Sequence, residues 1–349
     1  MRDKILFNFD IEKINAVFME KTGKGLDFNK KTTIGRVGIG VSKGHFGEYL
    51  QGHFDDIHGG INDRACITVP LKVNMGNCGG GKTGAEDYYE LPVAEAGSIA
   101  VFEPGEDGKV VVEPADKIFS KNTAEFILKL TGKAECSGRL RIVTGGEVSR
   151  GLGTSTGDII ATLRAVSDSF SINFKDRLVG QFVTQIEGAS DGLMYDDATL
   201  FITTQGKVLE AYDVEYPAVE ILGFDTSIGK AGVDTLDIPP RHYSDEEKEQ
   251  LVILRSAVKT ALEEKNIELL GQVSTSSAQI NQRFLKKPHL EEIIELSKKN
   301  SAAGIVAAHS GTMVGVIMDV RKMPTEKELK DIIKGLRGLG FSDIKRYLT

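Results

Sequence analysis

The 349-residue sequence lacks several features that mark particular classes of protein. It has no basic excess, since 43 lysines and arginines stand against 50 aspartates and glutamates and give a formal net charge of −7. Nucleic-acid binders and proteins of anionic membrane surfaces usually carry such an excess, so neither partner is expected. No apolar run approaches the roughly 18 residues of a membrane span. The N-terminal stretch MRDKILFNFDIEKI also lacks the apolar core of a signal peptide.

Cysteine and proline are scarce. The three cysteines, Cys66, Cys78 and Cys136, have no short paired spacing, which argues against a disulfide framework or a zinc site. A reducing compartment, the cytoplasm, is therefore expected. Only 9 prolines accompany 39 glycines, and glycine without proline indicates close approach of the backbone to a ligand rather than a linker.

The apolar spacing predicts an α+β fold in two halves, with the boundary between 205 and 218. Residues 11–22 are predicted to form a short helix ahead of the main fold. Residues 33–141 are predicted mostly as strands, interrupted by a helix over 122–131 with Asn122 as its N-cap.

After Thr144 the sequence has strongly periodic helical segments. Two capping-box patterns, at Ser244 with Glu247 and at Thr325 with Glu328, predict where two of the helices begin. The predicted helices are 155–170, 175–187, 244 to about 284, 289–299 and 325–338, and the predicted strands are 198–204, 207–214, 218–225, 304–310 and 313–319.

Glycine is concentrated in two segments that could each hold phosphate. The first, GNCGGGKT at 76–83, matches G-x-x-x-x-G-K-[ST], in which backbone N–H groups, a lysine and a hydroxyl bind the phosphates and Mg²⁺. A long helix should follow, but Gly84 and Pro92 stand too close together for one. The segment is therefore predicted to be a turn, and a P-loop NTPase using Lys82 and Thr83 is kept as an alternative.

The second segment, GGEVSRGLGTSTGD at 145–158, has the context that the first lacks. The strand-like RLRIVT precedes it and a periodic helix follows it. Gly151 and Gly153 let the backbone approach an anion, and three consecutive hydroxyl residues stand at the helix start, where N–H groups and the positive dipole end favour phosphate. We therefore predict a polyphosphate site here, with Ser155 available to Mg²⁺.

Three motifs, in order along the chain, resemble those of the GHMP kinases, the family of galactokinase, homoserine kinase, mevalonate kinase and phosphomevalonate kinase. GLGTSTGDIIATL at 151–163 resembles the phosphate motif of that family. GHFGEYLQG at 44–52 is similar to its N-terminal substrate motif, and GIVAAHSGTMVGVIM at 304–318 to its C-terminal glycine motif. Their combination is similar to that of the L-threonine kinases of cobalamin synthesis and propanediol metabolism.

The resemblance implies a two-domain GHMP kinase-like fold. Residues 1–33 would be an extension, 34–210 an N-terminal βαβ-type nucleotide domain with the phosphate loop, and 211–349 a C-terminal ferredoxin-like α/β domain. The implied activity uses ATP and Mg²⁺ to phosphorylate a small-molecule hydroxyl, that of L-threonine or a related hydroxy amino acid. The alternatives are another alcohol kinase of homoserine or mevalonate type and a catalytically silent nucleotide sensor. A homodimer is compatible with this prediction.

The resemblance also implies the site residues. Glu187 and Ser155 would hold Mg²⁺, and Asp191 would orient or deprotonate the acceptor hydroxyl. Glu48 and Gln51, three apart and expected on a turn or short helix, would suit the ammonium and carboxylate of a small amino acid. The predicted nucleotide-binding residues are Gly146, Arg150, Gly151, Leu152, Gly153, Thr154, Ser155, Thr156 and Gly311, and the predicted substrate-binding residues are His45, Glu48, Gln51, Asp191, His309 and Ser310.

Overall fold

The computed structural model describes residues 11–25, 35–54, 63–76, 87–105, 108–146, 150–227, 241–308 and 310–349. The helices among them are α2 (Ile11–Thr22), η1 (Tyr88–Glu90), α3 (Ile118–Leu130), α4 (Thr154–Ser169), α5 (Asp176–Glu187), α6 (Asp245–Glu263), α7 (Ile267–Asn281), α8 (Leu290–Lys299) and α9 (Glu326–Gly338). The strands are β1 (Gly38–Ser42), β2 (Gly44–Phe54), β3 (Asp63–Leu71), β4 (Gly97–Gly105), β5 (Val110–Glu113), β6 (Ser137–Gly145), β7 (Asp197–Ile202), β8 (Lys207–Glu215), β9 (Val219–Asp225), β10 (Gly304–Ala307), β11 (Met313–Asp319) and β12 (Lys345–Leu348).

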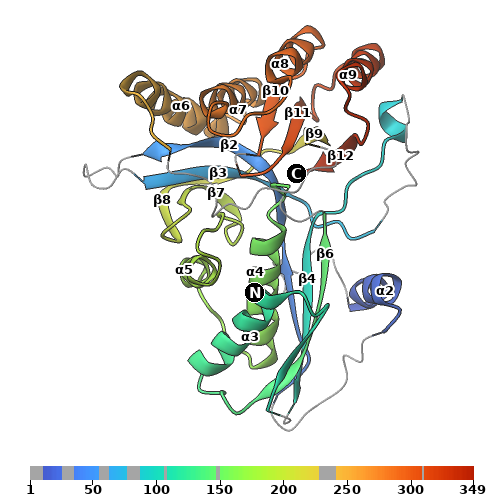
Figure 1. Cartoon of the computed structure of the whole chain (residues 1–349), viewed down its shortest axis with the longest axis vertical. Helices are drawn as coiled ribbons and strands as arrows, with labels where there is room; N and C mark the ends of the chain where they lie inside the picture. Colours follow the sequence, from blue (N-terminus) through green and yellow to red (C-terminus); the bar gives the residue numbers. More distant parts are fainter. Residues whose placement is uncertain are drawn as a thin grey trace.

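A four-stranded sheet in the order β1-β4-β6-β5 forms the lower part of the molecule in Figure 1. Its pairs are antiparallel except for β5 with β6. Helices α3 and α4 lie on one side of this sheet and α2 on the other (Figure 1). The backbones of α4 and β1 approach closely, because a Cβ at Gly40 would lie 1.9 Å from the Ala161 carbonyl oxygen. The helix that follows the phosphate loop is thereby fixed against the sheet.

An eight-stranded antiparallel sheet in the order β12-β9-β11-β10-β2-β3-β7-β8 forms the upper part. Helices α6, α7, α8 and α9 cover its upper face in Figure 1. The contact between β2 and β10 joins the two halves of the sequence, through the pair Glu48 and Ala307. One buried cluster accordingly contains Leu50 and Ile67 together with Val306.

The α+β class is confirmed, and so are both capping boxes. In each box the serine or threonine side chain accepts a hydrogen bond from the backbone N–H of its glutamate partner. The glutamate side chain in turn accepts one from the backbone N–H of the serine or threonine. Two predicted boundaries are wrong. The helix predicted from 244 to about 284 is broken between α6 and α7, where Lys265 has a φ of 51° and Asn266 caps α7.

The start of α3 is the second correction. The helix begins at Ile118, so Asn122 lies inside it, and Lys117 occupies the N-cap position without a side-chain cap. The apolar periodicity did not predict the first turn of α3, because the apolar side chains of that turn do not face the core. Ile118 is 63% and Phe119 is 44% exposed.

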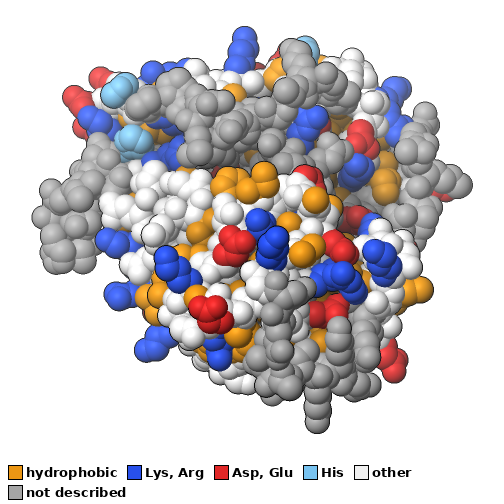
Figure 2. Space-filling view, turned by 60° about the horizontal axis from the view of Figure 1, so that its bottom comes forward, with side chains coloured by type: hydrophobic (Ala, Val, Ile, Leu, Met, Phe, Trp, Pro, Cys, Tyr) orange, Lys and Arg blue, Asp and Glu red, His pale blue; other side chains and the backbone are white. Residues whose placement is uncertain are grey.

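None of the helices in the described ranges is long and apolar enough to cross a bilayer. On the face shown in Figure 2, lysines and arginines lie interspersed with aspartates and glutamates. Of the first glycine-rich segment, only Gly76 falls inside the described residues, and the rest of 76–83 lies outside them.

Candidate active site

A cavity of about 340 Å³ lies where the start of β2, the loop before α4 and the end of α5 meet. It also reaches the start of α3, so two helix N-termini border the same space. The predicted site residues that line it are His45, Glu48, Gln51, Gly151, Leu152, Gly153, Thr154, Ser155, Thr156, Glu187, Asp191 and Ser310. Of the other predicted residues, Gly146, Arg150 and Gly311 are not among its lining, and His309 lies outside the described residues.

The loop before α4 has the backbone that its glycines predict. Gly151 and Gly153 have φ values of 90° and 62°, and Gly153 is the left-handed N-cap of α4. A side chain at Gly153 would also collide with His45, because a Cβ there would lie 2.2 Å from the imidazole Cδ2. This N-cap has no side chain to satisfy the first N–H groups of α4, so they suit an anion in the cavity.

The carbonyls of this loop are held by neighbouring segments. The His45 N–H donates to the Leu152 carbonyl at 3.2 Å, and the Gly47 N–H donates to the Gly151 carbonyl at 3.3 Å. On the other side, the N–H of Thr312 donates to the Arg150 carbonyl at 3.0 Å. The loop is therefore fixed between β2 and the turn before β11.

Gly311 supports the loop from that turn. Its Cβ would lie 2.2 Å from the Arg150 carbonyl oxygen, so only glycine lets the two backbones meet. The Arg150 side chain points elsewhere and pairs with Asp225 at 2.9 Å. Arg150 and Gly146 line a neighbouring cavity, so the structure does not bring either into the one described above.

Glu187, the last residue of α5, faces the start of α4. Its Oε2 accepts a hydrogen bond from the Thr156 hydroxyl at 2.7 Å. Burial raises the pKa of Glu187 to about 7, against the opposing effect of hydrogen bonds from the Ser155 and Thr156 hydroxyls. A carboxylate beside two hydroxyls is a set of hard oxygen donors, so Ser155 and Glu187 fit a Mg²⁺ ion.

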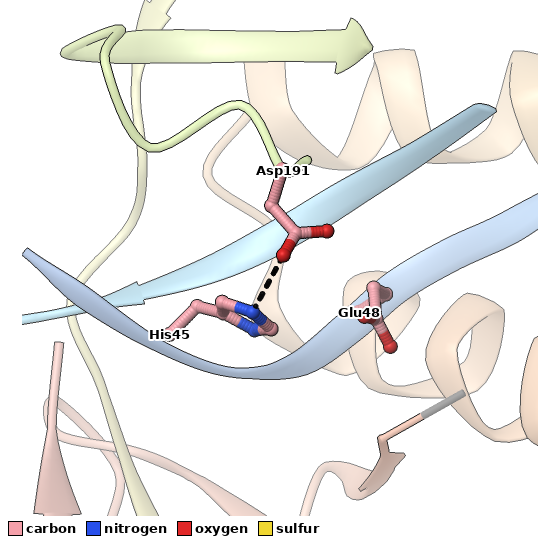
Figure 3. Close-up of side chains that lie close together, drawn as sticks. All are labelled: His45, Glu48 and Asp191. Atoms are coloured by element: carbon pink, nitrogen blue, oxygen red, sulfur yellow. Dashed lines mark hydrogen bonds and ion pairs between the residues drawn. The ribbon is translucent and has the colours of Figure 1, made fainter. Parts of the chain in front are cut away.

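Asp191 lies in the turn after α5 and points toward His45 on β2 (Figure 3). The His45 Nε2 and the Asp191 Oδ2 are 3.0 Å apart, and the His45 Nδ1 is 3.3 Å from the Gly47 carbonyl oxygen. Both ring nitrogens thus face acceptors, which favours the doubly protonated ring. Burial lowers the pKa of His45, but Asp191 and Glu48 outweigh it and raise that pKa to about 9.

Glu48 is buried, with 2% of its surface exposed, and corrects one sequence expectation. His45, Glu48 and Gln51 lie on the strand β2 rather than on a turn or short helix. Successive residues of a regular strand alternate in direction, so residues three apart would face opposite ways. Register shifts between His45 and Glu48 and between Glu48 and Leu50 interrupt the alternation, and all three side chains line the cavity.

His45, Glu48 and Asp191 bring ligand-type atoms within 4.8 Å of one another (Figure 3). This spacing would suit a metal ion by distance alone. A doubly protonated imidazole has no lone pair for a metal, however. The cluster is better suited to a cationic group of a substrate, such as an ammonium that donates to Glu48.

Gln51 is anchored by α7 and by the chain before α6. Its side-chain carbonyl accepts a hydrogen bond from the buried Arg241 guanidinium. The backbone N–H of Gln51 donates to the Ser277 hydroxyl at 3.0 Å, and its carbonyl accepts from Asn281 at 3.0 Å. Its amide oxygen is therefore already engaged inside the protein.

Sequence reasoning missed Lys117, which lines the cavity at the start of α3. Its Nζ lies 2.6 Å from the Asp158 carboxylate and donates to the Thr144 hydroxyl at 2.9 Å. The Ser98 hydroxyl completes the surroundings of Asp158 at 2.6 Å. The polar run EPADK at 113–117, between a strand and a helix, would have indicated Lys117 if the start of α3 had been predicted correctly.

Comparison with known proteins bears on this geometry. The family model for the GHMP kinases N terminal domain matches residues 118–205, and the one for the GHMP kinases C terminal matches residues 258–340. The chain carries both GHMP kinase domains. The predicted resemblance and the GHMP kinase-like fold are thus confirmed.

The curated relatives of the chain are distant. It is 25% identical over 175 residues to an L-threonine kinase of Salmonella typhimurium, covering 50% of this chain and 58% of the relative. It is 22% identical over 199 residues to a homoserine kinase of Streptococcus pneumoniae, covering 54% and 66%. The chain thus spans about three fifths of the length of the curated relatives that it matches.

Solved structures of the family share its fold over most of their length. The crystal structure of an L. major mevalonate kinase in complex with R-mevalonate superimposes with a TM-score of 0.59 at 16% identity, covering 91% of this chain and 96% of that one. A homoserine kinase from Cytophaga hutchinsonii gives a TM-score of 0.57 at 13% identity, covering 74% and 87%. At these identities the likeness concerns the fold.

Proposed function

We propose that this GHMP kinase transfers the γ-phosphoryl group of ATP to the hydroxyl of L-threonine or a related hydroxy amino acid. The observation that carries the proposal is the arrangement of one cavity. A helix N-terminus suited to phosphate, the carboxylate Glu187 and the carboxylate Asp191 all face it. Phosphoryl transfer depends mainly on such positioning and on neutralisation of charge.

The nucleotide is held chiefly by backbone. The loop at 150–153 and the first turn of α4 offer N–H groups to the phosphates, in a chain whose net charge is −7. Ser155 and Glu187 would hold the Mg²⁺ ion, which when bound neutralises phosphate charge. The neighbouring Lys117 also lines this cavity, where it is paired with Asp158.

The acceptor lies on the other side, at Asp191. The hydroxyl oxygen of the acceptor forms a new bond to the γ-phosphorus, and the bond from that phosphorus to the ADP oxygen breaks. The hydroxyl proton passes to the Asp191 carboxylate. The proton on His45 compensates the charge of this carboxylate and fixes its direction, at 3.0 Å.

The choice of a hydroxy amino acid rests on Glu48 and on the relatives. Glu48 is a buried carboxylate close to Asp191, and its oxygens can accept hydrogen bonds from an ammonium group. The curated relatives include L-threonine kinases and homoserine kinases, which supports an acceptor with both a hydroxyl and an ammonium group. A place in cobalamin synthesis and a cytoplasmic location, as the motifs and the free Cys66 and Cys136 suggest, stay predictions.

The test is ADP release from Mg-ATP with L-threonine, L-serine, L-homoserine, mevalonate and galactose as separate acceptors. We expect turnover with L-threonine or a close hydroxy amino acid and little with mevalonate or galactose. Turnover confined to mevalonate or galactose would contradict the acceptor class. Tight nucleotide binding with no turnover on any acceptor would instead favour a silent sensor.

A matched pair of variants separates the two phosphate segments. Ser155→Ala should abolish ADP release, and Lys82→Ala should leave it within about threefold of the unchanged protein, since Gly84 and Pro92 stand too close together in the sequence for the helix that a P-loop needs. Loss of activity in Lys82→Ala alone would favour a P-loop NTPase.

A further inference from the structure

The geometry points to Arg64 as the group that binds the carboxylate of the acceptor, so that the site selects amino acids over amino alcohols. This inference rests on the proposed function and names a specificity residue for it. Arg64 lies on β3 and its side chain lines the same cavity as Glu48 and Asp191.

The strand places Arg64 at a suitable distance from the acceptor hydroxyl. Arg64 and Cys66 are two residues apart on β3, so their side chains point to the same face at a spacing of about 7 Å. The Cys66 thiol lies 3.9 Å from the Asp191 Oδ1. The hydroxyl and the carboxylate of a β-hydroxy amino acid are on adjacent carbons, so one molecule can reach from Asp191 to Arg64.

The pKa of the Cys66 thiol also depends on the charges around it. Burial raises its pKa, the carboxylates of Asp191 and Glu48 raise it further, and the Arg64 guanidinium opposes them. The thiol therefore lies among all three charged groups. A hydroxy amino acid bound here would have Asp191 to accept its hydroxyl proton and Glu48 to accept hydrogen bonds from its ammonium group. Arg64 would bind its carboxylate.

A hydrogen bond at the Nε of its guanidinium holds the Arg64 side chain in place. Its Nε donates to the Thr203 hydroxyl at 3.0 Å, and the Thr203 N–H donates to the Arg64 carbonyl at 3.1 Å. The Thr203 carbonyl in turn accepts from the Ser190 N–H at 2.9 Å, which ties Arg64 to the turn that carries Asp191. The two Nη groups can then bind a carboxylate in the bidentate manner that suits a planar guanidinium.

The other cations of the cavity already have acidic partners. Lys117 pairs with Asp158, and His45 pairs with Asp191. Within the described ranges no carboxylate forms an ion pair with Arg64. Because Glu48, Glu187 and Asp191 would repel an anionic group, a carboxylate entering this cavity needs the charge of Arg64.

The experiment compares two acceptors of the same shape, L-threonine and L-threonine amide, in steady-state kinetics with Mg-ATP. For Arg64→Gln we expect a KM for L-threonine about 100-fold higher and a KM for the amide within about threefold of that of the unchanged protein. Arg64→Lys should lie between, with KM for L-threonine about 10-fold higher, because an ammonium cannot bind in the bidentate manner. The matched control is Arg255→Gln, which removes an arginine paired with Glu210 away from the cavity.

The outcomes distinguish a wrong assignment of Arg64 from a wrong proposed function. Equal losses for both acceptors in Arg64→Gln, or an unchanged KM for L-threonine, would overturn the assignment of Arg64 while leaving the proposed function intact. Failure of the unchanged protein to phosphorylate L-threonine or a related hydroxy amino acid would overturn the proposed function and this inference with it. A normal KM for ATP and a normal circular-dichroism spectrum in Arg64→Lys show that a selective loss is not misfolding.

Discussion

His45 and Asp191 stand 146 positions apart in the sequence and meet at 3.0 Å in the cavity. The sequence supplied both as candidates, His45 from the N-terminal motif and Asp191 from the turn after a helix. Their pairing could not be predicted, because it depends on how β2 lies against that turn. The same holds for Glu48, whose direction is set by the irregular pairing of β2 with β3.

Replacement of Asp191 is the most direct test of a single side chain. Asp191→Asn keeps the shape and removes the proton acceptor, so kcat should fall about 10²- to 10⁴-fold while the KM for ATP stays nearly unchanged. Asp196→Asn is the matched control, since Asp196 is an exposed acid that pairs with Lys43. Retention of more than about a tenth of the activity in Asp191→Asn would exclude a role in proton transfer.

The raised pKa of His45 predicts a pH dependence of stability. The folded-state pKa of about 9 lies above the ordinary 6.5, so the ion pair contributes fully below pH 6.5 and is lost as the pH rises through about 9. The difference in unfolding free energy between the unchanged protein and His45→Gln should therefore shrink between pH 6.5 and 9.5, by at least about 1 kcal/mol. Urea unfolding at the two pH values measures it, and a difference that is constant or grows would contradict the ion pair.

At the scale of elements, the phosphate loop is shaped by its neighbours as much as by its own glycines. Its carbonyls are held by β2 and by the turn before β11. The positions of Gly151 and Gly153 could be predicted from the strand before them and the periodic helix after them. The support from Gly311 could not, because it is a contact between backbones far apart in the chain.

Gly311→Ala tests this support. Its methyl group would meet the Arg150 carbonyl, so the loop should shift and the affinity for ATP should fall at least about 10-fold. Gly338→Ala in α9 is the matched control, because nothing lies within 4 Å of its Cβ position. Nucleotide titration by calorimetry measures both. An unchanged affinity in Gly311→Ala would show that the turn does not hold the loop.

The predicted helices differ in how well the sequence locates them. The starts of α6 and α9 were predicted correctly because their capping boxes are local and complete. The start of α3 was not, because its first apolar side chains face solvent rather than the core. Because of that error, Lys117, which lines the cavity, was not predicted as a site residue.

For the whole molecule, the eight-stranded sheet joins the two halves predicted from the sequence, 34–210 and 211–349. β2 and β3 pair with each other and continue into β10 and β7, and their shared core includes side chains from α6 and α7. Composition and periodicity predicted two halves and the α+β class. They could not predict this shared sheet, since strand pairing over such distances leaves no local pattern.

The shared sheet predicts that the halves depend on each other. A fragment of residues 34–210 would expose the core face of β2 and β3, so it should show no cooperative thermal transition, whereas the full chain should. Co-expression with residues 211–349 is the control and should restore the transition. Cooperative unfolding of the isolated fragment, followed by circular dichroism, would contradict the prediction.

The central claim concerns phosphoryl transfer from ATP to a hydroxy amino acid in the cavity between Glu187 and Asp191. The most direct measurement is mass spectrometry of the products formed from γ-labelled Mg-ATP and L-threonine. The account predicts O-phospho-L-threonine carrying the label, formed by the unchanged protein and reduced at least about 100-fold in Asp191→Asn. Label recovered as inorganic phosphate alone, or equal product from Asp191→Asn, would contradict it.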